Sequence, residues 1–192
     1  IDINDKKKVR KYIPIIKEEI NRTLILMDDY LDYTKIKIKK EEIDLIMLLE
    51  EIEHALRPLF LEKDINFTLT DKFEECYLEA DYNRLKQVFI NLLKNAVEAR
   101  DVTKKEMKVQ IEIEIDKKEL IIFIRDNGIG MTEEELKNIG EMFFTTKQKG
   151  TGLGTSLSKE IIELHHGTIK YNSEKQKGTE VKITLPMDKN MS

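Results

Sequence analysis

Residues 126–131 of this 192-residue chain read Asp-Asn-Gly-Ile-Gly-Met, and they directly follow an apolar run at residues 120–124. The run predicts a central strand, and the Asn-Gly pair predicts a sharp turn at its end. Glycine allows a backbone to approach a flat ligand closely, because no Cβ stands in the way. The carboxylate of Asp126 can accept a hydrogen bond from an exocyclic amine at that point. Taken alone, the segment is more often an ordinary Asn-Gly turn.

Upstream, residues 82–101 are predicted to form an amphipathic helix. Its polar stripe carries Asn91 and Asn95, although asparagine is a poor helix former. The other polar positions of the stripe are Arg84, Gln87, Lys94 and Glu98. The apolar face comprises Leu85, Val88, Phe89, Leu92, Ala96 and Ala99. Amide oxygens suit Mg²⁺ beside phosphate groups, so the stripe favours a metal–phosphate site over a surface helix with chance asparagines.

Downstream, residues 150–154 read Gly-Thr-Gly-Leu-Gly and lead into a predicted helix over residues 154–165. Free backbone N–H groups and the helix dipole make such a junction an anion site. The pattern is neither a Walker loop nor a dinucleotide fingerprint, because the following residues and the spacing differ. Lys147 precedes the glycines and is placed to reach a phosphate. Phe143 and Phe144 form either a buried anchor or a docking surface.

The composition places limits on the class of protein. Hydrophobic residues make up 40% of the chain, enough for a core, while 36% charged residues indicate long solvated helices or a mobile segment. The net charge of −4 argues against a nucleic-acid partner. One cysteine, Cys76, allows no internal disulfide and suits a reducing compartment. The sequence shows no signal peptide and no apolar run near the ~20 residues that span a membrane. We therefore expect a cytoplasmic fragment of a longer protein, and the sequence leaves open whether that longer protein is anchored in a membrane.

Residues 6–37 are predicted to form one long helix. Its apolar stripe recurs at coiled-coil spacing: Ile13, Ile16, Ile20, Leu24, Met27, Leu31 and Thr34. Such a stripe requires a partner helix, in this chain or another, unless the helix packs on its own domain. Pro14 predicts either a helix start or a kink at that point.

The rest of the chain predicts an α+β domain, with helices on one face of a mixed, mostly antiparallel sheet. Asp44 is the predicted N-cap of a helix over residues 45–62, in which Pro58 is a difficulty. Thr132 and Glu135 predict a capping box on a short helix. Strands are expected at residues 65–69, 76–80, 109–115, 120–125, 167–171 and 180–185, with a linker or short strand at 35–42 and a hairpin turn at 117–118. His54 is expected to pack or lie on the surface, and His165 and His166 to serve a helix end.

In order and spacing, residues 91–96, 126–131, 143–147 and 150–154 resemble the N, G1, F and G2 boxes of sensor histidine kinases. These kinases belong to the ATPase superfamily of gyrase, Hsp90 and MutL. The resemblance covers roughly residues 40–186, and its details look closest to the sporulation-type kinases of spore-forming bacteria. It implies a Bergerat-type (GHKL) α/β sandwich that holds ATP and Mg²⁺ under a lid at about 132–153.

The resemblance also implies a role for each matching residue. Asn95 is the principal Mg²⁺ ligand with Asn91 as its companion, Lys94 and Glu98 complete the catalytic stripe, and Asp126 recognises adenine. The other cofactor-binding positions are Gly128, Gly130, Met131, Phe144, Lys147, Gly150, Thr151, Gly152, Leu153, Gly154 and Thr179. Hydrolytic members of the superfamily carry Glu where this chain has Asn91. Without that base water is poorly activated, which suits an enzyme that keeps the γ-phosphoryl group for a protein side chain.

The segment at residues 1–37 resembles the second helix of the kinases' dimerisation and phosphoacceptor hairpin. The family's acceptor histidine lies on the first helix, and here no histidine precedes His54. The resemblance therefore implies a catalytic domain at residues 38–186 and a tail at 187–192, within a protein-histidine kinase whose acceptor lies elsewhere. The implied partners are a response regulator, a second kinase subunit and a protein inhibitor on the hairpin.

Two alternative functions stay open on the sequence alone. A regulatory module with an inactive site is opposed by the intact asparagines, Asp126 and the glycines of residues 150–154. A gyrase- or Hsp90-type ATPase is opposed by Asn91, and an anti-sigma-factor kinase by the long helix at 6–37. A product of ADP alone, together with loss of activity in Asn91→Ala, would favour the ATPase.

Overall fold

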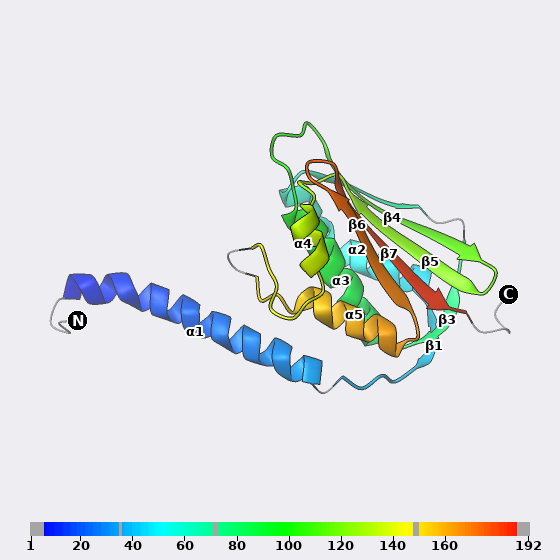
Figure 1. Cartoon of the computed structure of the whole chain (residues 1–192), viewed down its shortest axis with the longest axis horizontal. Coiled ribbons are helices and arrows are strands. Elements are labelled where there is room, and N and C mark those ends of the chain that lie inside the picture. Colours follow the sequence, from blue (N-terminus) through cyan, green and yellow to red (C-terminus); the bar gives the residue numbers. More distant parts are fainter. Residues whose placement is uncertain (1–5, 35, 71–72, 148–149, 188–192) are drawn as a thin grey trace.

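The fold is built on a mixed sheet, seen in Figure 1 in a computed structural model that describes residues 6–34, 36–70, 73–147 and 150–187. Within these residues five strands pair in the order β2-β4-β5-β7-β6. The strands are β2 (Ile65–Thr70), β4 (Met107–Asp116), β5 (Glu119–Asp126), β6 (Thr168–Glu174) and β7 (Gly178–Pro186). The pair β2–β4 is parallel and the other pairs are antiparallel. The predicted mixed, mostly antiparallel sheet is therefore confirmed, including the hairpin turn at Lys117, whose φ is 58°.

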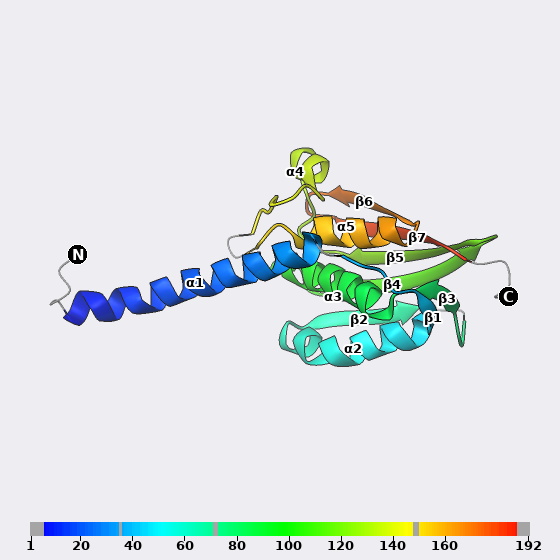
Figure 2. The ribbon, with the colours of Figure 1, turned by 90° about the horizontal axis from the view of Figure 1, so that it is seen from below.

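Helices cover one face of this sheet, as Figure 2 shows. They are α2 (Leu45–Glu62), α3 (Tyr82–Glu98) and α5 (Gly154–Leu164), and α3 contacts both of the others. The predicted apolar face of α3 is buried except at Ala99, which is the half-buried C-cap because the helix ends at Glu98 rather than at residue 101. Leu93 and Val97 are buried as well, so this face is wider than predicted.

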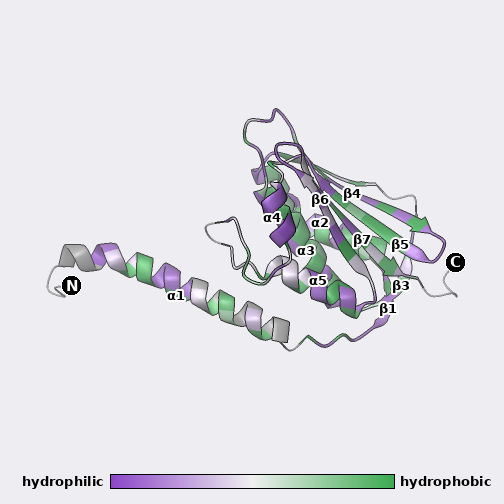
Figure 3. Ribbon diagram, viewed as in Figure 1, coloured by the Kyte–Doolittle hydropathy of each residue, from purple (hydrophilic) through white to green (hydrophobic). Residues whose placement is uncertain are grey.

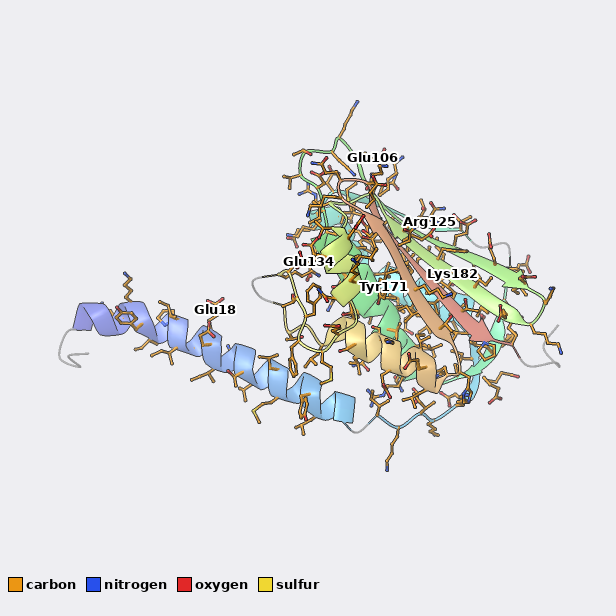
Figure 4. All side chains as sticks on the ribbon, in the orientation of Figure 1. Glu18, Glu106, Arg125, Glu134, Tyr171 and Lys182 are labelled. Carbon is orange, nitrogen blue, oxygen red and sulfur yellow. The ribbon has the colours of Figure 1, made fainter. Side chains whose placement is uncertain are left out.

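The other face of the sheet is charged, which explains why no helix packs there among the described residues. Arg125 on β5 lies between Glu112 on β4 and Glu180 on β7, with its Nε 2.6 Å from a Glu180 carboxylate oxygen. The guanidinium also lies 4.5 Å from the ring centre of Phe123, beside Lys182 at 5.6 Å. Figure 4 labels Arg125 and Lys182 on these strands. Solvated ion pairs of this kind contribute little to stability but keep the face in water.

A small antiparallel pair, β1 (Glu41–Asp44) with β3 (Tyr77–Ala80), joins the linker to the domain. Asp44 ends β1 and is the N-cap of α2, as predicted. Its Oδ1 accepts hydrogen bonds from the backbone N–H of Ile46 at 3.0 Å and of Cys76 at 3.1 Å. A short strand was one of the two alternatives for residues 35–42, but its pairing with β3 was not predicted, because a four-residue strand carries no signal for its partner.

Helix α1 (Lys6–Thr34) projects away from the sheet (Figure 1). Figure 3 shows hydrophobic patches recurring along it, and the stripe residues Ile13, Ile16, Ile20, Leu24, Met27 and Leu31 are 46–56% exposed. The side chain of Thr34 lies outside the described part. Among the helices of the described residues, none combines the length and apolar character needed to cross a membrane.

A helix start at Pro14 and the difficulty at Pro58 are wrong, because α1 and α2 continue through these residues. The alternative of a kink at Pro14 stays a prediction. Proline removes one N–H and leaves the carbonyl four residues earlier without its helical donor. Both prolines are exposed, as are the residues four positions before them, Arg10 and His54. Water can therefore supply the missing donor.

Asp81 connects the linker to two helices of the domain. Its Oδ2 accepts a hydrogen bond from Lys39 N at 2.8 Å, and its Oδ1 caps α3 through Arg84 N at 3.0 Å. The backbone N–H of Asp81 donates to Nε2 of His165, the C-cap residue of α5, at 2.9 Å. Nδ1 of His165 therefore carries the ring proton and donates to Ile161 O at 2.7 Å.

The histidines behave as expected. His165 serves the end of α5, and burial lowers its pKa, so the ring is neutral at physiological pH. His166 follows in a left-handed turn with φ 62°, and His54 is exposed on α2. None of them is placed beside the asparagine stripe of α3.

Replacing Asp44 by Ala tests the junction of β1, α2 and β3. We expect the free energy of unfolding to fall by about 1–2 kcal/mol, because an N-cap and a partner for Cys76 N are lost together. Urea unfolding followed by circular dichroism measures this. Glu50→Ala, an exposed change on the same helix, should stay within about 0.5 kcal/mol. Equal effects of the two changes would contradict the capping role.

Candidate functional site

The asparagine stripe of α3 and the start of α5 pack directly against each other. Asn91 Nδ2 donates to Ser158 Oγ on α5 at 2.9 Å. Gly154, the first residue of α5, lies so close that a Cβ built there would be 2.3 Å from Asn91 Oδ1. Only glycine permits this approach without displacing the amide. The structure thus brings together two predicted segments that are more than fifty residues apart in sequence.

The first turn of α5 has no side-chain cap. Its N-cap residue, Leu153, makes no side-chain capping hydrogen bond, so that side chain does not satisfy the first N–H groups of the helix. Instead the Leu153 side chain is fully buried and anchors the loop. Leu153 N contacts Thr151 Oγ1 at 3.4 Å, and Gly152 O accepts from Phe143 N at 3.0 Å.

A groove of about 410 Å³ follows the exposed side of α3. It is lined by Asn83, Lys86, Gln87, Ile90, Asn91 and Lys94. Lys94 is exposed at the end nearest the asparagines, so its ammonium group is free to approach a bound anion. The groove keeps Asn91 accessible to solvent along α3.

Asp126 lies at the end of β5, opposite Thr179 of β7. Its Oδ1 accepts a hydrogen bond from Gly128 N at 2.8 Å. Burial raises the pKa of its carboxyl group to about 6, against the opposing effects of backbone hydrogen bonds from Gly128 and Thr179 and of the Lys104 charge. At neutral pH the group is therefore ionised but poorly solvated, and it can accept a hydrogen bond from a ligand.

The turn after Asp126 is held from two sides. Ile129 N donates to Ala99 O at the end of α3, at 2.8 Å, and Met131 N donates to Ser173 Oγ on β6, at 2.9 Å. Gly130 has φ 60°, and a Cβ there would lie 2.0 Å from Glu174 O. A side chain at residue 130 would push β6 away from the turn.

Two residues that support this turn were missed at the level of sequence. Ser173 Oγ bonds to Gly178 O at 2.8 Å and lies 3.0 Å from Thr179 Oγ1. The Lys104 ammonium donates to the carbonyl oxygens of Asn127, of Gly128 at 3.2 Å and of Gln176 at 2.8 Å. Ser173 could have been found from the sequence, because it is a polar residue at an inward-facing position of a strand. Lys104 could not, because a lysine in a polar loop does not stand out in the sequence.

The expected lid contains α4 (Glu133–Asn138), whose predicted capping box between Thr132 and Glu135 is confirmed. No other helix or strand occurs among its described residues, 139–147 and 150–153. Phe143 is 56% exposed with φ 67°, whereas Phe144 is half-buried. The two phenylalanines thus divide between the two interpretations, Phe143 on the surface and Phe144 partly anchored.

The side chain of Lys147 reaches from the lid to α3 and places its positive charge there. Its Nζ donates to Asn95 Oδ1 at 2.6 Å and also contacts a carboxylate oxygen of Glu98. The predicted residues Asn95, Glu98 and Lys147 are therefore in one place, on the same helical stripe as Asn91 and Lys94. The oxygens of Asn95 and Glu98 already hold a cation, which is the chemistry that a metal–phosphate ligand needs.

The donor set decides which metal chemistry fits. In the described part of the chain, no three His, Cys, Asp or Glu side chains gather as a metal cage. Two amide oxygens beside an anion-binding helix start suit a cation that takes few protein ligands and completes its shell with phosphate oxygens and water. That description fits Mg²⁺.

A family described as "Histidine kinase-, DNA gyrase B-, and HSP90-like ATPase" matches residues 80–189, more than half of the chain. The chain belongs to this family. The match begins at the last residue of β3 and includes α3, the turn after β5, the lid and α5, which are the elements of the site. The predicted GHKL fold is confirmed.

Similar curated proteins are sensor kinases of Bacillus. Sporulation kinase B of Bacillus subtilis (strain 168) is 34% identical over 183 residues, which cover 95% of this chain and 42% of the relative. Sporulation kinase E of the same strain is 36% identical over 191 residues, which cover 93% of this chain and 24% of that kinase. The predicted resemblance to sporulation-type kinases is confirmed, and the chain spans less than half the length of these relatives.

Solved histidine kinases show the same architecture. The catalytic domain of histidine kinase ThkA has a TM-score of 0.69 and 32% identity, with 78% of this chain and 96% of that domain covered. ThkA in complex with the response regulator protein TrrA has a TM-score of 0.75 and 29% identity, and the match covers 97% of this chain and 53% of the ThkA chain. The chain is thus the ATP-binding catalytic domain of a sensor histidine kinase, together with α1.

In this kinase domain, the pH dependence of nucleotide affinity tests Asp126. If adenine donates to the ionised carboxylate, Asp126→Asn should weaken ADP binding at pH 8 by roughly 1–3 kcal/mol, because a charged acceptor becomes a neutral amide. Wild-type affinity should then be full above pH 6 and fall by up to about tenfold per pH unit below it. Calorimetry on both proteins from pH 5 to 8 measures this. The ratio of the wild-type affinity to the Asp126→Asn affinity is taken at each pH, so that protonation of ADP itself cancels. A ratio that does not change with pH would contradict the adenine role.

The same variant should change stability in the opposite direction. A carboxyl pKa raised to about 6 in the folded state means that ionisation destabilises the fold, an effect absent below the unfolded pKa and complete above pH 6. In nucleotide-free protein at pH 7, Asp126→Asn should raise the free energy of unfolding by roughly 1 kcal/mol, the full shift being discounted for partial exposure. Urea unfolding at pH 7 and pH 4 measures it, and most of the gain should be lost at pH 4.

Proposed function

We propose that this domain binds ATP with Mg²⁺ and donates the γ-phosphoryl group to a histidine side chain of a sensor histidine kinase. The main support is the contact between the asparagine stripe of α3 and the start of α5. It brings amide oxygens, free N–H groups and the Lys147 ammonium around one point. Metal ligands, phosphate donors and a mobile cation are the parts that phosphoryl transfer requires.

Adenine would bind at the end of β5. Asp126 accepts a hydrogen bond from the exocyclic amine, and its half-buried position gives that bond strength. Thr179 lies opposite on β7, and Gly128, Gly130 and Met131 shape the turn below the base.

The phosphates would lie at the start of α5. The N–H groups after Leu153 offer donors, together with the helix dipole, which favours negative charge by up to about 1 kcal/mol at an exposed site. Gly150, Thr151, Gly152 and Gly154 shape this loop. Lys147 is near enough to Asn95 to move from the amide oxygen to a phosphate oxygen without leaving the site.

Asn95 and Asn91 would be the protein ligands of Mg²⁺, with Asn95 the principal one. The metal supplies neutralisation of the phosphate charge. Lys147 Nζ contacts Asn95 Oδ1, so two cations would compete for this oxygen and a bound Mg²⁺ would favour the lysine moving away from it. The Glu98 carboxylate contacts the same ammonium group and would offset part of its charge.

Transfer to a protein side chain, rather than hydrolysis, follows from residue 91. An amide cannot accept a proton from water, so no general base stands at that position of α3. The intact hydrogen bonds of Asn91 and Asn95 argue against an inactive regulatory module. Rate enhancement would arise from positioning and charge neutralisation, with Lys94 beside the transferred group.

The proposed partners follow from α1 and from the relatives. The exposed apolar stripe of α1 suits a helix of a second kinase subunit, within a dimerisation unit at residues 1–37 followed by the catalytic unit at 38–186. A response regulator would take the phosphoryl group from the histidine onto an aspartate. A protein inhibitor could bind the same helices, and the use of ATP favours a cytoplasmic location for the domain.

Replacing Asn95 by Ala tests the metal site. We expect wild-type protein to bind ATP more tightly with Mg²⁺ than with EDTA, and Asn95→Ala to lose about tenfold or more of that gain. Calorimetry under both conditions measures the ratio. Asn83→Ala, on the exposed side of the same helix, should keep it. A wild-type ratio of one would refute the proposed metal-dependent function, and an unchanged ratio in Asn95→Ala would refute the ligand assignment.

A further inference from the structure

Ser158 is a buried hydroxyl on the inner side of α5. It is 1% exposed and stands beside Leu157, with Ile161 and Ile162 on the next turn, all of them buried. Its Oγ lies 2.9 Å from Gly154 O and 2.9 Å from Asn91 Nδ2. Through these two contacts the hydroxyl joins the first turn of α5 to the asparagine stripe of α3.

The chemistry of the two contacts determines how the amide of Asn91 is oriented. A serine hydroxyl has a single proton, and a carbonyl oxygen such as Gly154 O can only accept. The proton of Ser158 is therefore used on Gly154 O, and Ser158 Oγ is left as an acceptor toward Asn91. Only the Nδ2 end of the amide can donate to it. A flipped amide would present Oδ1 to Ser158, which could bond to it only by turning its proton away from Gly154 O.

The close approach of Gly154 agrees with this orientation. A Cβ built on Gly154 would lie 2.3 Å from Asn91 Oδ1 and 3.2 Å from Nδ2. The oxygen is thus the end of the amide nearer to the start of α5, where the phosphates are proposed to bind. The hydroxyl contact fixes the nitrogen, and the oxygen consequently faces the loop.

We propose that Ser158 is a positioning residue that holds Asn91 with its oxygen toward the metal–phosphate site. This inference rests on the proposed role of Asn91 as a companion ligand of Mg²⁺. A flipped amide would present an NH₂ group to the cation, and an NH₂ group cannot act as its ligand. Ser158 is 67 residues from Asn91 in the chain and is buried behind it, so it acts on the metal through the amide.

The experiment measures ATP affinity by calorimetry with Mg²⁺ and with EDTA, and takes the ratio as the metal-linked gain. Ser158→Ala should lower this ratio by about tenfold, the scale for removing a group that orients a metal ligand, while the affinity in EDTA stays unchanged. Ser158→Thr keeps the hydroxyl and should retain the ratio. Thermal unfolding of each variant establishes that the folded protein is being titrated.

A symmetric side chain at residue 91 provides the matched control. In Asn91→Asp both terminal atoms are oxygens, so orientation no longer matters and adding Ser158→Ala to that variant should leave its metal-linked gain unchanged. An equal loss from Ser158→Ala with and without the Asn91→Asp change would show a packing effect and overturn the inference. A full gain in Ser158→Ala alone would overturn it too. Absence of any gain in wild-type protein would instead refute the proposed function.

Discussion

Helix α3 has to satisfy two environments along its whole length, and the rest of the domain is arranged around that constraint. Leu85, Phe89 and Leu93 are fully buried against the sheet and the neighbouring helices, each at roughly 1.5–3 kcal/mol of hydrophobic stabilisation. The opposite side presents Asn91 and Asn95. Turning the helix by one residue would place an amide in the core, at a cost of about 1–3 kcal/mol if unpaired. The core therefore sets the direction in which the site faces.

The adenine end of the site shows the opposite balance, since a charge is retained where burial disfavours it. The Asp126 carboxylate is offset by backbone N–H groups and by the Lys104 ammonium, which also fastens three carbonyl oxygens around the same turn. The buried carboxylate lowers the free energy of unfolding, but it keeps a hydrogen-bond acceptor in place for a ligand. Such a conflict between stability and local chemistry is expected where a protein binds something else.

The sequence predicted the elements whose signal is local. The alternation of β4, the amphipathic pattern of α3 and the caps at Asp44 and Thr132 all depend on residues within a few positions of each other, and all are confirmed. Contacts without a local signal were not predicted, among them the pairing of β1 with β3 and the reach of Lys104 to Gln176. The helix start at Pro14 and the difficulty at Pro58 were expected from a local rule, which does not include the fact that both positions face water.

The candidate site was predicted in a different way from the fold. Its residues were found as segments of the chain, and the resemblance to sensor histidine kinases supplied their order and roles. What it did not supply is how they are held: the lysine of the lid on Asn95, the hydroxyl of α5 on Asn91, and Ser173 below the turn. These supports lie 42–67 residues from the groups they hold, so they are visible only when the chain is folded.

The joint at Asp81 has a mechanical consequence. This residue binds the linker from α1, the beginning of α3 and the end of α5, while the asparagines and the phosphate loop lie toward the far ends of the same two helices. A displacement of the linker at Lys39 would therefore act on the beginning of α3 and on the end of α5 through the single residue Asp81.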